Sequence, residues 1–139
     1  MTTAPPLHRD PAIVAAAERA IAELADRCST LEAAAVTSDD GFRVAGVHGA
    51  AGDANRLASM TSTTQALGEA IIRELDLGDA SHVAVAGTRG ALLVRRIGSH
   101  KLVLVAVFAP ASVDDGRIAR GVAKRLAHTL DAVLEHRDS

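Results

Sequence analysis

The sequence predicts a three-layer α/β/α sandwich with five antiparallel strands, its elements following the order α-β-β-α-β-β-β-α. Two observations predict this fold. Residues 101–108 are apolar at both alternating sets of positions, so a strand there must be covered on both faces. The connections 87–90 and 98–100 are too short for a parallel crossover, which needs about a dozen residues, so the strands they join are antiparallel.

The first predicted helix covers residues 11–31. Asp10 supplies an N-cap oxygen, and Pro11 lacks an N–H at a position where none is needed. Apolar residues then recur at helical spacing as far as Leu31. Residues 1–10 contain two adjacent prolines and mixed polar residues, so we expect a disordered N-terminal segment there.

A hairpin and a long helix follow. Strands at 33–37 and 42–47 flank Ser38-Asp39-Asp40-Gly41, which is typical of a turn. Helix 54–76 is predicted to start at Asp53 and to end with Gly78 as a left-handed cap. One stripe of this helix is mainly apolar, and a shoulder beside it contains Thr61, Gly68 and Ile72; the stripe consists of Leu57, Met60, Thr64, Leu67, Ile71 and Leu75.

The remaining strands are predicted at 82–86, 91–97 and 101–108. Pro110 ends the last strand, and Asp114-Asp115 favours the start of a third helix that reaches about residue 134. We expect one domain over 11–134 and a frayed tail over 135–139, since 139 residues are too few for two ordinary domains.

The composition narrows the class of protein. Only 1% of the residues are aromatic, so small aliphatic side chains must form the core, and each contributes little buried area. Such a fold tends to gain stability by burying surface against a second copy. The net charge is -2, and there is no basic run, so we expect neither a nucleic-acid partner nor membrane insertion.

The compartment is predicted from what the sequence lacks. Cys28 is the single cysteine, so no internal disulfide is possible, and its place on the apolar stripe of the first helix favours a buried, inert thiol. The sequence starts without the pattern of a signal peptide, and the apolar run 102–110 is shorter than the roughly 20 residues that span a bilayer. We therefore expect a cytoplasmic protein.

No catalytic motif is present. The sequence contains no Walker-type phosphate loop, no Gly-x-Gly-x-x-Gly after a strand and no Gly-x-Ser-x-Gly elbow. The adjacent aspartates at 39–40 and 114–115 are interpreted as turn and helix caps rather than as paired acids. We therefore expect no enzymatic activity and no cofactor.

The six histidines are His8, His48, His82, His100, His128 and His136, and no two share a helix at a spacing of three or four. A metal site or a pH-sensitive seam around His82 is one interpretation, and separate solvated side chains are the favoured one. We expect no metal.

Several motifs in order resemble the roadblock (dynein light chain) family, within the profilin-like folds. They are Asp39-Asp40-Gly41-Phe42 leading to Ala45, Asp53 with Leu57-Ala58, Leu75-x-Leu77-Gly78, and Arg89-Gly90-Ala91-Leu92-Leu93-Val94. The resemblance covers about 30–134. The Thr61-Ser62-Thr63-Thr64 run and the N-terminal segment depart from the family pattern.

The resemblance implies a homodimer that pairs through the third strand and the shoulder of the middle helix, giving one sheet across two chains. The implied interface residues are Thr61, Gly68, Ile72, His82, Val83, Ala84, Val85 and Ala86. It further implies a scaffold or regulator that docks a small Ras-like GTPase, as bacterial members of the family do.

Arg95-Arg96 and Gly68 each have two interpretations. Successive residues of a strand point to opposite faces, so each arginine needs an acidic partner in the fold or a docked protein outside it, and both remain open. A glycine inside a helix costs about 1 kcal/mol relative to alanine. Gly68 therefore marks a close helix–helix contact or a tolerated imperfection.

Two other classes of function compete with the scaffold. Profilin-like sandwiches resemble sensory domains, so a small-molecule-sensing module is the alternative; the near absence of aromatic residues argues against its pocket. An enclosed cavity above about 300 Å³ would favour that alternative. An enzyme is the third class, and no motif supports it.

Overall fold

The computed structural model describes residues 6–38, 42–47, 54–80, 82–97, 102–109 and 113–138. The predicted order of helices and strands is confirmed, with one additional short helix at the start. The elements are η1 (Leu7–Arg9), α1 (Pro11–Arg27), β1 (Leu31–Ser38), β2 (Arg43–Val47), α2 (Ala54–Glu74), β3 (Val83–Gly87), β4 (Gly90–Arg96), β5 (Leu102–Phe108) and α3 (Val113–Asp138).

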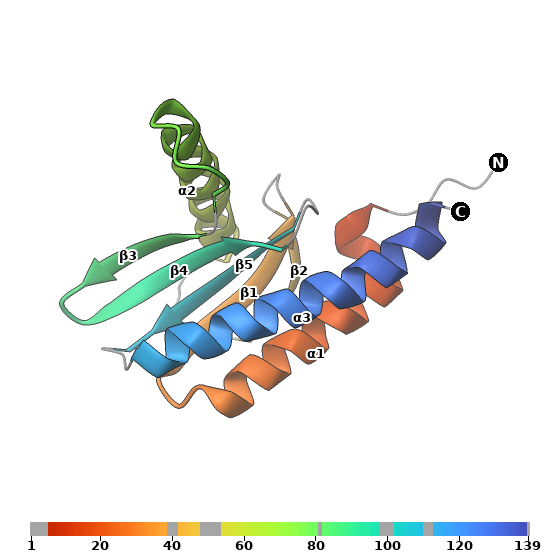
Figure 1. Ribbon diagram of the computed structural model, residues 1–139. Coiled ribbons are helices and arrows are strands. Elements are labelled where there is room, and N and C mark those ends of the chain that lie inside the picture. Colours follow the sequence, from red (N-terminus) through yellow and green to blue (C-terminus); the bar gives the residue numbers. More distant parts are fainter. Residues whose placement is uncertain are drawn as a thin grey trace.

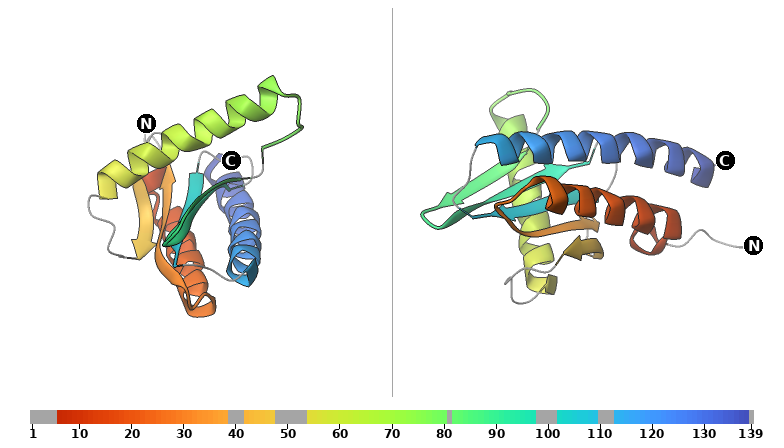
Figure 2. Two further views of the ribbon diagram at one scale, coloured as in Figure 1. Left: turned by 90° about the vertical axis from the view of Figure 1, so that its left-hand side faces the viewer. Right: turned by 90° about the horizontal axis from the view of Figure 1, so that it is seen from below.

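The five strands form one antiparallel sheet in the order β2-β1-β5-β4-β3. Helices α1 and α3 lie side by side on one face, and α2 crosses the other (Figures 1 and 2). Strand β5 is central, which explains why its side chains are apolar on both faces. The predicted three-layer sandwich is therefore confirmed.

The two faces of the sheet carry cores of different size. The larger core packs α1 and α3 against strands β1, β2 and β5, and it includes Ile13, Leu24, Leu104, Leu126 and Leu130. The core on the α2 face consists of Val94, Val103 and Val105, with Val83 and Leu92 packed against it. Apolar burial therefore holds α1 and α3 more firmly than α2.

Helix α1 starts as predicted, because the Asp10 carboxylate accepts a hydrogen bond from the N–H of Ala12 at 3.0 Å and Pro11 is the first helical residue. The predicted end at residue 31 is wrong. Cys28 is already extended, and Leu31 belongs to β1, where it pairs with Phe108. Both residues pack on the larger core, so the apolar spacing continues after the helix has ended.

The ends of the described chain differ from expectation. Residues 7–9 were expected to be disordered, but they form η1, in which the N–H groups of Arg9 and Asp10 donate to the Pro6 carbonyl. The His8 ring stacks on Phe42 at 4.5 Å, which attaches this segment to the start of β2. Helix α3 continues to Asp138, four residues past its predicted end.

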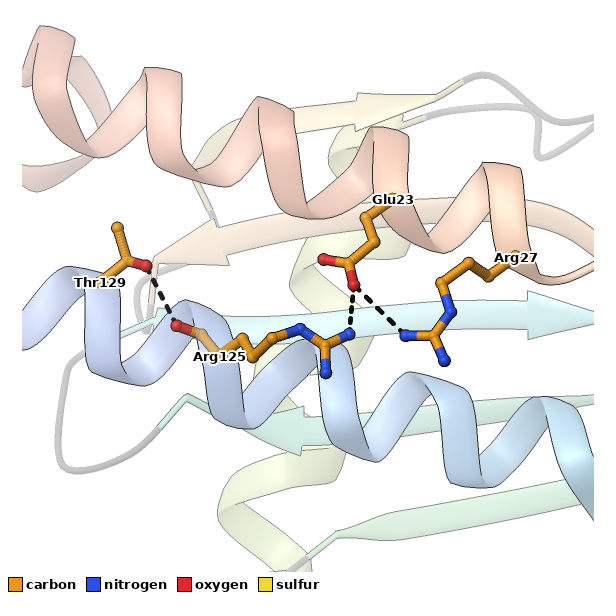
Figure 3. A network of polar contacts seen from close by, with 4 residues as sticks. All are labelled: Glu23, Arg27, Arg125 and Thr129. Atoms are coloured by element: carbon orange, nitrogen blue, oxygen red, sulfur yellow. Dashed lines mark hydrogen bonds and ion pairs between the residues drawn. The ribbon is translucent and has the colours of Figure 1, made fainter.

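A polar network joins the two helices of the larger layer (Figure 3). Glu23 of α1 accepts hydrogen bonds from Arg27 and, across the helix pair, from Arg125 of α3. All three side chains are substantially exposed, and ion pairs of this kind contribute only about 0–1 kcal/mol. The network therefore helps to align α1 with α3 and adds little to the free energy of unfolding.

The predicted hairpin is confirmed in its strands. Strand β1 pairs with β2, and beside the turn the N–H of Ser38 donates to the Phe42 carbonyl while the N–H of Phe42 donates to Ser38 Oγ. Residues 39–41 of the turn, the expected cap Asp53 and the loop 98–100 lie outside the described residues.

Helix α2 ends differently from the prediction, which placed the left-handed cap at Gly78. The N–H of Leu77 donates to the Ile72 carbonyl and the N–H of Asp76 to the Arg73 carbonyl, which is the Schellman pattern. Asp76 holds the left-handed position, with φ 52°, and Gly78 is a second positive-φ residue two positions later, with φ 87°. The helix therefore ends on Asp76, whose Cβ makes the left-handed conformation sterically unfavourable.

We expect Asp76→Gly to raise the free energy of unfolding by about 1 kcal/mol, since glycine adopts positive φ without strain. The change also removes a negative charge from a helix C-terminus, where it is unfavourable. Urea unfolding at fixed protein concentration measures the effect. Asp76→Asn removes the charge but keeps a side chain, so its gain should be smaller, and a loss of stability in Asp76→Gly would contradict the assignment.

Candidate functional site

Helix α2 presents its polar side to the sheet and its apolar side to solvent. Thr61 and Gln65 face inward and are each only 2% exposed, although both are polar. Gln65 Oε1 is buried and accepts no hydrogen bond from any described residue, and a buried acceptor left unpaired costs about 1–3 kcal/mol. Gly68, Glu69 and Ile72 continue the inward side as half-buried residues.

The apolar stripe predicted from the sequence faces outward. Leu67 and Leu75 are each 61% exposed, and Ile71 and Met60 are exposed between and before them. Side chains four residues apart lie on one helix face, so Leu67, Ile71 and Leu75 form a continuous apolar strip. An exposed strip of this kind marks a surface that another molecule covers.

Strand β3 extends this apolar surface at the edge of the sheet. Val85 is 55% exposed and pairs with Leu92, which places it on the α2 face. Ala84 and Ala86 point to the opposite face and are exposed as well. We call Leu67, Ile71, Leu75 and Val85 the α2–β3 surface. It combines an apolar strip with a strand whose outer backbone groups have no neighbouring strand in the sheet.

The opposite edge of the sheet is partly capped. On β2, Arg43 Nη2 donates to the carbonyl of Gly46 at 2.9 Å, so a side chain already occupies one acceptor of that strand. The charged side chain also hinders a second strand from pairing there. Among the described strands, β3 is therefore the edge better suited to sheet extension.

The structure places the eight predicted interface residues in two groups. His82, Ala84, Val85 and Ala86 are exposed at the β3 edge. Thr61, Gly68, Ile72 and Val83 face the interface between α2 and the sheet of the same chain, and Thr61 is buried there. The predicted strand residues are therefore accessible apart from Val83, whereas on α2 the exposed side is the stripe beside the predicted shoulder.

Gly68 has a close neighbour within the chain. A Cβ added at Gly68 would overlap Cγ2 of Val83, a stiff β-branched side chain on β3. The glycine therefore allows α2 to approach a strand, where the sequence had suggested a helix. This contact sets the height of the helix above the β3 edge.

Arg96 forms a structural ion pair on the α2 face. Its Nη2 donates to Glu69 Oε1 at 2.6 Å and its Nε to the same oxygen at 3.0 Å, while Gln65 Nε2 donates to that oxygen at 3.0 Å. Burial tends to raise the pKa of Glu69. The hydrogen bonds from Arg96 and Gln65, with the charges of Arg96 and Arg73, outweigh it and hold the pKa below its ordinary value.

Arg95 points to the other face of the sheet, beside α3. It is partly buried and makes no hydrogen bond or ion pair with any residue in the described part of the chain. Burial, and then the charge of Arg120, lower its pKa below the ordinary value for arginine. Arg95 lines an open groove of about 540 Å³ together with Asp79, Lys124, His128 and Asp131. The two adjacent arginines therefore have different environments.

Other candidate sites were also located. Within the described ranges, no three His, Cys, Asp or Glu side chains converge as metal ligands would. His82 and His128 are exposed, and Cys28 is buried as a free thiol, whereas His48 and His100 lie outside those ranges. No helix in the described part of the chain combines the length and apolarity needed to cross a membrane.

Comparison with known proteins establishes the family. The model of the Roadblock/LC7 domain matches residues 18–108, which is more than half of the chain. The chain belongs to the Roadblock/LC7 domain family. No curated protein matches the sequence.

Solved structures of Roadblock/LC7 proteins share this fold. A Roadblock/LC7 domain from Streptomyces avermitilis has a TM-score of 0.71 at 22% identity, covering 85% of this chain and 97% of that one. A structure described as MglB with tetrameric arrangement has a TM-score of 0.70 at 23% identity, covering 85% and 92%. Myxococcus xanthus MglB has a TM-score of 0.70 at 18% identity, covering 92% and 98%.

Some members of these sites were missed at the sequence level. Glu69 lies 27 residues before Arg96, so no local pattern connects them. Arg120 and Lys124 could have been found from the sequence. They belong to a basic stripe along one side of α3, in which residues recur at intervals of three and four: Arg117, Arg120, Lys124 and His128.

We expect Glu69→Gln to lower the free energy of unfolding by about 1–2 kcal/mol at neutral pH, because it removes the charge that Arg96 contacts. Since the pKa of Glu69 is lowered in the folded state, its contribution is complete above the unfolded value of about 4.5 and is lost as the pH falls through the folded value. Urea titrations of both proteins between neutral and acidic pH measure the difference.

Glu23→Gln is the matched control, because Glu23 also binds two arginines but at an exposed position. Its effect at neutral pH should stay below about 1 kcal/mol. Equal losses in the two variants, or a Glu69 effect that persists at the acid end, would contradict a stabilising role for the Glu69–Arg96 pair.

Proposed function

We propose that this chain is a non-catalytic homodimeric scaffold or regulator that docks a small Ras-like GTPase. The α2–β3 surface carries the dimer part of this proposal. It joins an apolar strip to an open strand edge, and both are satisfied at once if a second copy pairs at β3 and lays its own α2 alongside. The inward polar side of α2 supports the same view, since the helix gains little apolar burial within its own chain.

The docking role is supported by the family rather than by a bound partner. Roadblock/LC7 proteins generally act as scaffolds or regulators, and the sequence resemblance implies a GTPase as the partner. The chain carries no phosphate-binding loop of its own. A nucleotide reaction associated with this protein is therefore assigned to the docked partner.

The small-molecule-sensing alternative requires an enclosed, mainly apolar pocket. Two hollows lined by described residues are a groove of about 430 Å³ between α1 and β2 and the groove beside Arg95. Both are open to solvent and lined partly by charged side chains. Neither has the form that the sensing alternative needs, so we retain the scaffold as the proposed function.

We expect the protein to have the mass of two chains in solution, and Ile71→Glu or Val85→Glu to shift it to one chain. A buried unpaired carboxylate at the centre of the α2–β3 surface would oppose pairing by several kcal/mol. Light scattering after gel filtration at micromolar concentration measures the mass. Circular dichroism of the same samples checks that each variant is folded.

Phe42→Glu provides the control, because Phe42 is another exposed large apolar residue but lies next to β2 at the far edge. It should leave the dimer intact. A wild-type protein with the mass of one chain, or a loss of the dimer only in Phe42→Glu, would refute the α2–β3 surface as the dimer interface.

We further expect the dimer to bind a small Ras-like GTPase of the same organism, with affinities for the GDP and GTP-analogue forms that differ by at least about tenfold. A regulator of a switch must bind its two states differently, and a tenfold ratio corresponds to about 1.4 kcal/mol. Calorimetric titration of each nucleotide form measures the ratio. An intact dimer that binds no GTPase of the same genome at micromolar concentrations would contradict the docking role.

A further inference from the structure

The corner between β4 and α3 contains an arginine that has no acidic partner within the described ranges. The register pairs Arg95 with Leu104, which places its side chain on the α1–α3 face. Partly buried arginines normally bind a carboxylate, because removing a guanidinium from water is costly unless its donors are satisfied. Arg95 has no such partner among the described residues. Its arrangement therefore needs another explanation.

Two more cations flank this corner. Arg120 and Lys124 lie one turn apart on the same side of α3, and Lys124 lines the groove with Arg95. Arg120 is close enough for its charge to act on Arg95. Neither side chain makes an ion pair in the described part of the chain. The corner is thus a cluster of three positive charges.

The other flank of α3 is different. Arg125, one residue after Lys124, faces α1 and binds Glu23, as Figure 3 shows. On the sheet, Arg96 is likewise bound by Glu69 on the α2 face. The fold therefore pairs the neighbouring arginines with glutamates, whereas Arg95, Arg120 and Lys124 form no ion pair with any described residue.

The groove also holds two carboxylates, Asp79 and Asp131. Along α3, Asp131 lies eleven residues from Arg120, which corresponds to about 16 Å. Along α3 the groove is therefore polarised, because Lys124 of its lining lies about two turns before Asp131, and Arg120, outside the lining, lies one turn further from Asp131. A segment that binds there has a defined position for its own acidic residue.

We propose that this groove is a docking site for an acidic segment of a partner protein, in which an Asp or Glu side chain is bound by Arg95 and flanked by Arg120 and Lys124. A guanidinium binds a carboxylate through two parallel hydrogen bonds, so Arg95 gives the contact a fixed geometry. The two exposed cations add attraction at longer range. The inference deepens the proposed function, because it names the chemistry by which a partner is held.

The test uses a short fluorescent peptide with alternating Glu and Ala, and the same peptide with Gln in place of Glu. We expect the Glu peptide to bind the wild-type protein at low salt and to shift the Arg95 Nε–Hε signal in a two-dimensional NMR spectrum. The Gln peptide should not. Arg95→Gln should weaken binding by about fivefold or more, the loss expected for one charge-assisted contact.

Arg125→Gln is the matched control, because it removes the same charge from α3 on the flank that Glu23 occupies. It should change peptide affinity by less than about twofold. Equal weakening in the two variants would mean that binding follows net charge alone and would overturn the proposal. So would the absence of a shift at Arg95 when the peptide reaches millimolar concentration.

A second readout separates docking from a role in folding. Arg95→Gln should leave the Tm of the free protein unchanged or raise it, because it removes repulsion and no ion pair. A fall of several degrees would assign Arg95 to the fold and overturn the proposal.

The GTPase titration distinguishes this inference from the proposed function. A GTPase that binds wild type and Arg95→Gln equally well would leave the docking role standing and overturn the groove as its site. If no GTPase binds but the peptide results hold, the groove stands and the identity of the partner has to change.

Discussion

The position of α2 depends on polar contacts more than on apolar burial, and much of the structure follows from this. Its inward side contains Thr61, Gln65 and Glu69, and only a small cluster of valines lies beneath it. Arg96 holds the helix through Glu69, and Gly68 lets it approach Val83. The apolar residues that would normally anchor a helix are consequently available on the outside. A helix with its polar side inward and its apolar side in solvent gains further stability when another protein surface covers the apolar side.

The pair Arg95-Arg96 shows how one strand serves two faces. Alternation along β4 places Arg96 in the α2 layer, where it forms an ion pair with Glu69, and Arg95 in the α3 layer, where no described residue forms an ion pair with it. The first arginine maintains the fold. The second is attached to the same strand, so the register fixes the place on the α3 face from which its side chain extends.

Much of the fold was predictable from the sequence because its signals are local. The alternation in β5 required cover on both faces, and Asp10-Pro11 located the start of α1. The predicted end of α1 was wrong because the apolar spacing continues through Cys28 and Leu31, after the helix has ended. The predicted cap of α2 was wrong because Asp76, and not Gly78, adopts the left-handed conformation that ends the helix. For the site, the exposed β3 edge followed from the resemblance. The pairing of Glu69 with Arg96 could not be foreseen, since it depends on how α2 lies across the sheet.

The two edges of the sheet differ, and this sets a limit on growth. At β3 the outer backbone is open, whereas at β2 the Arg43 side chain already binds the Gly46 carbonyl. Two copies joined at β3 would form a sheet with a β2 strand at each end, and those ends are poor templates for another chain. Sheet pairing would then stop at two chains, because neither outer β2 edge readily accepts a third chain. This limit would prevent the protein from assembling into fibres through its strand edges. Any larger assembly would have to be built through helix faces and loops, and so would remain separable from the pairing of the sheets.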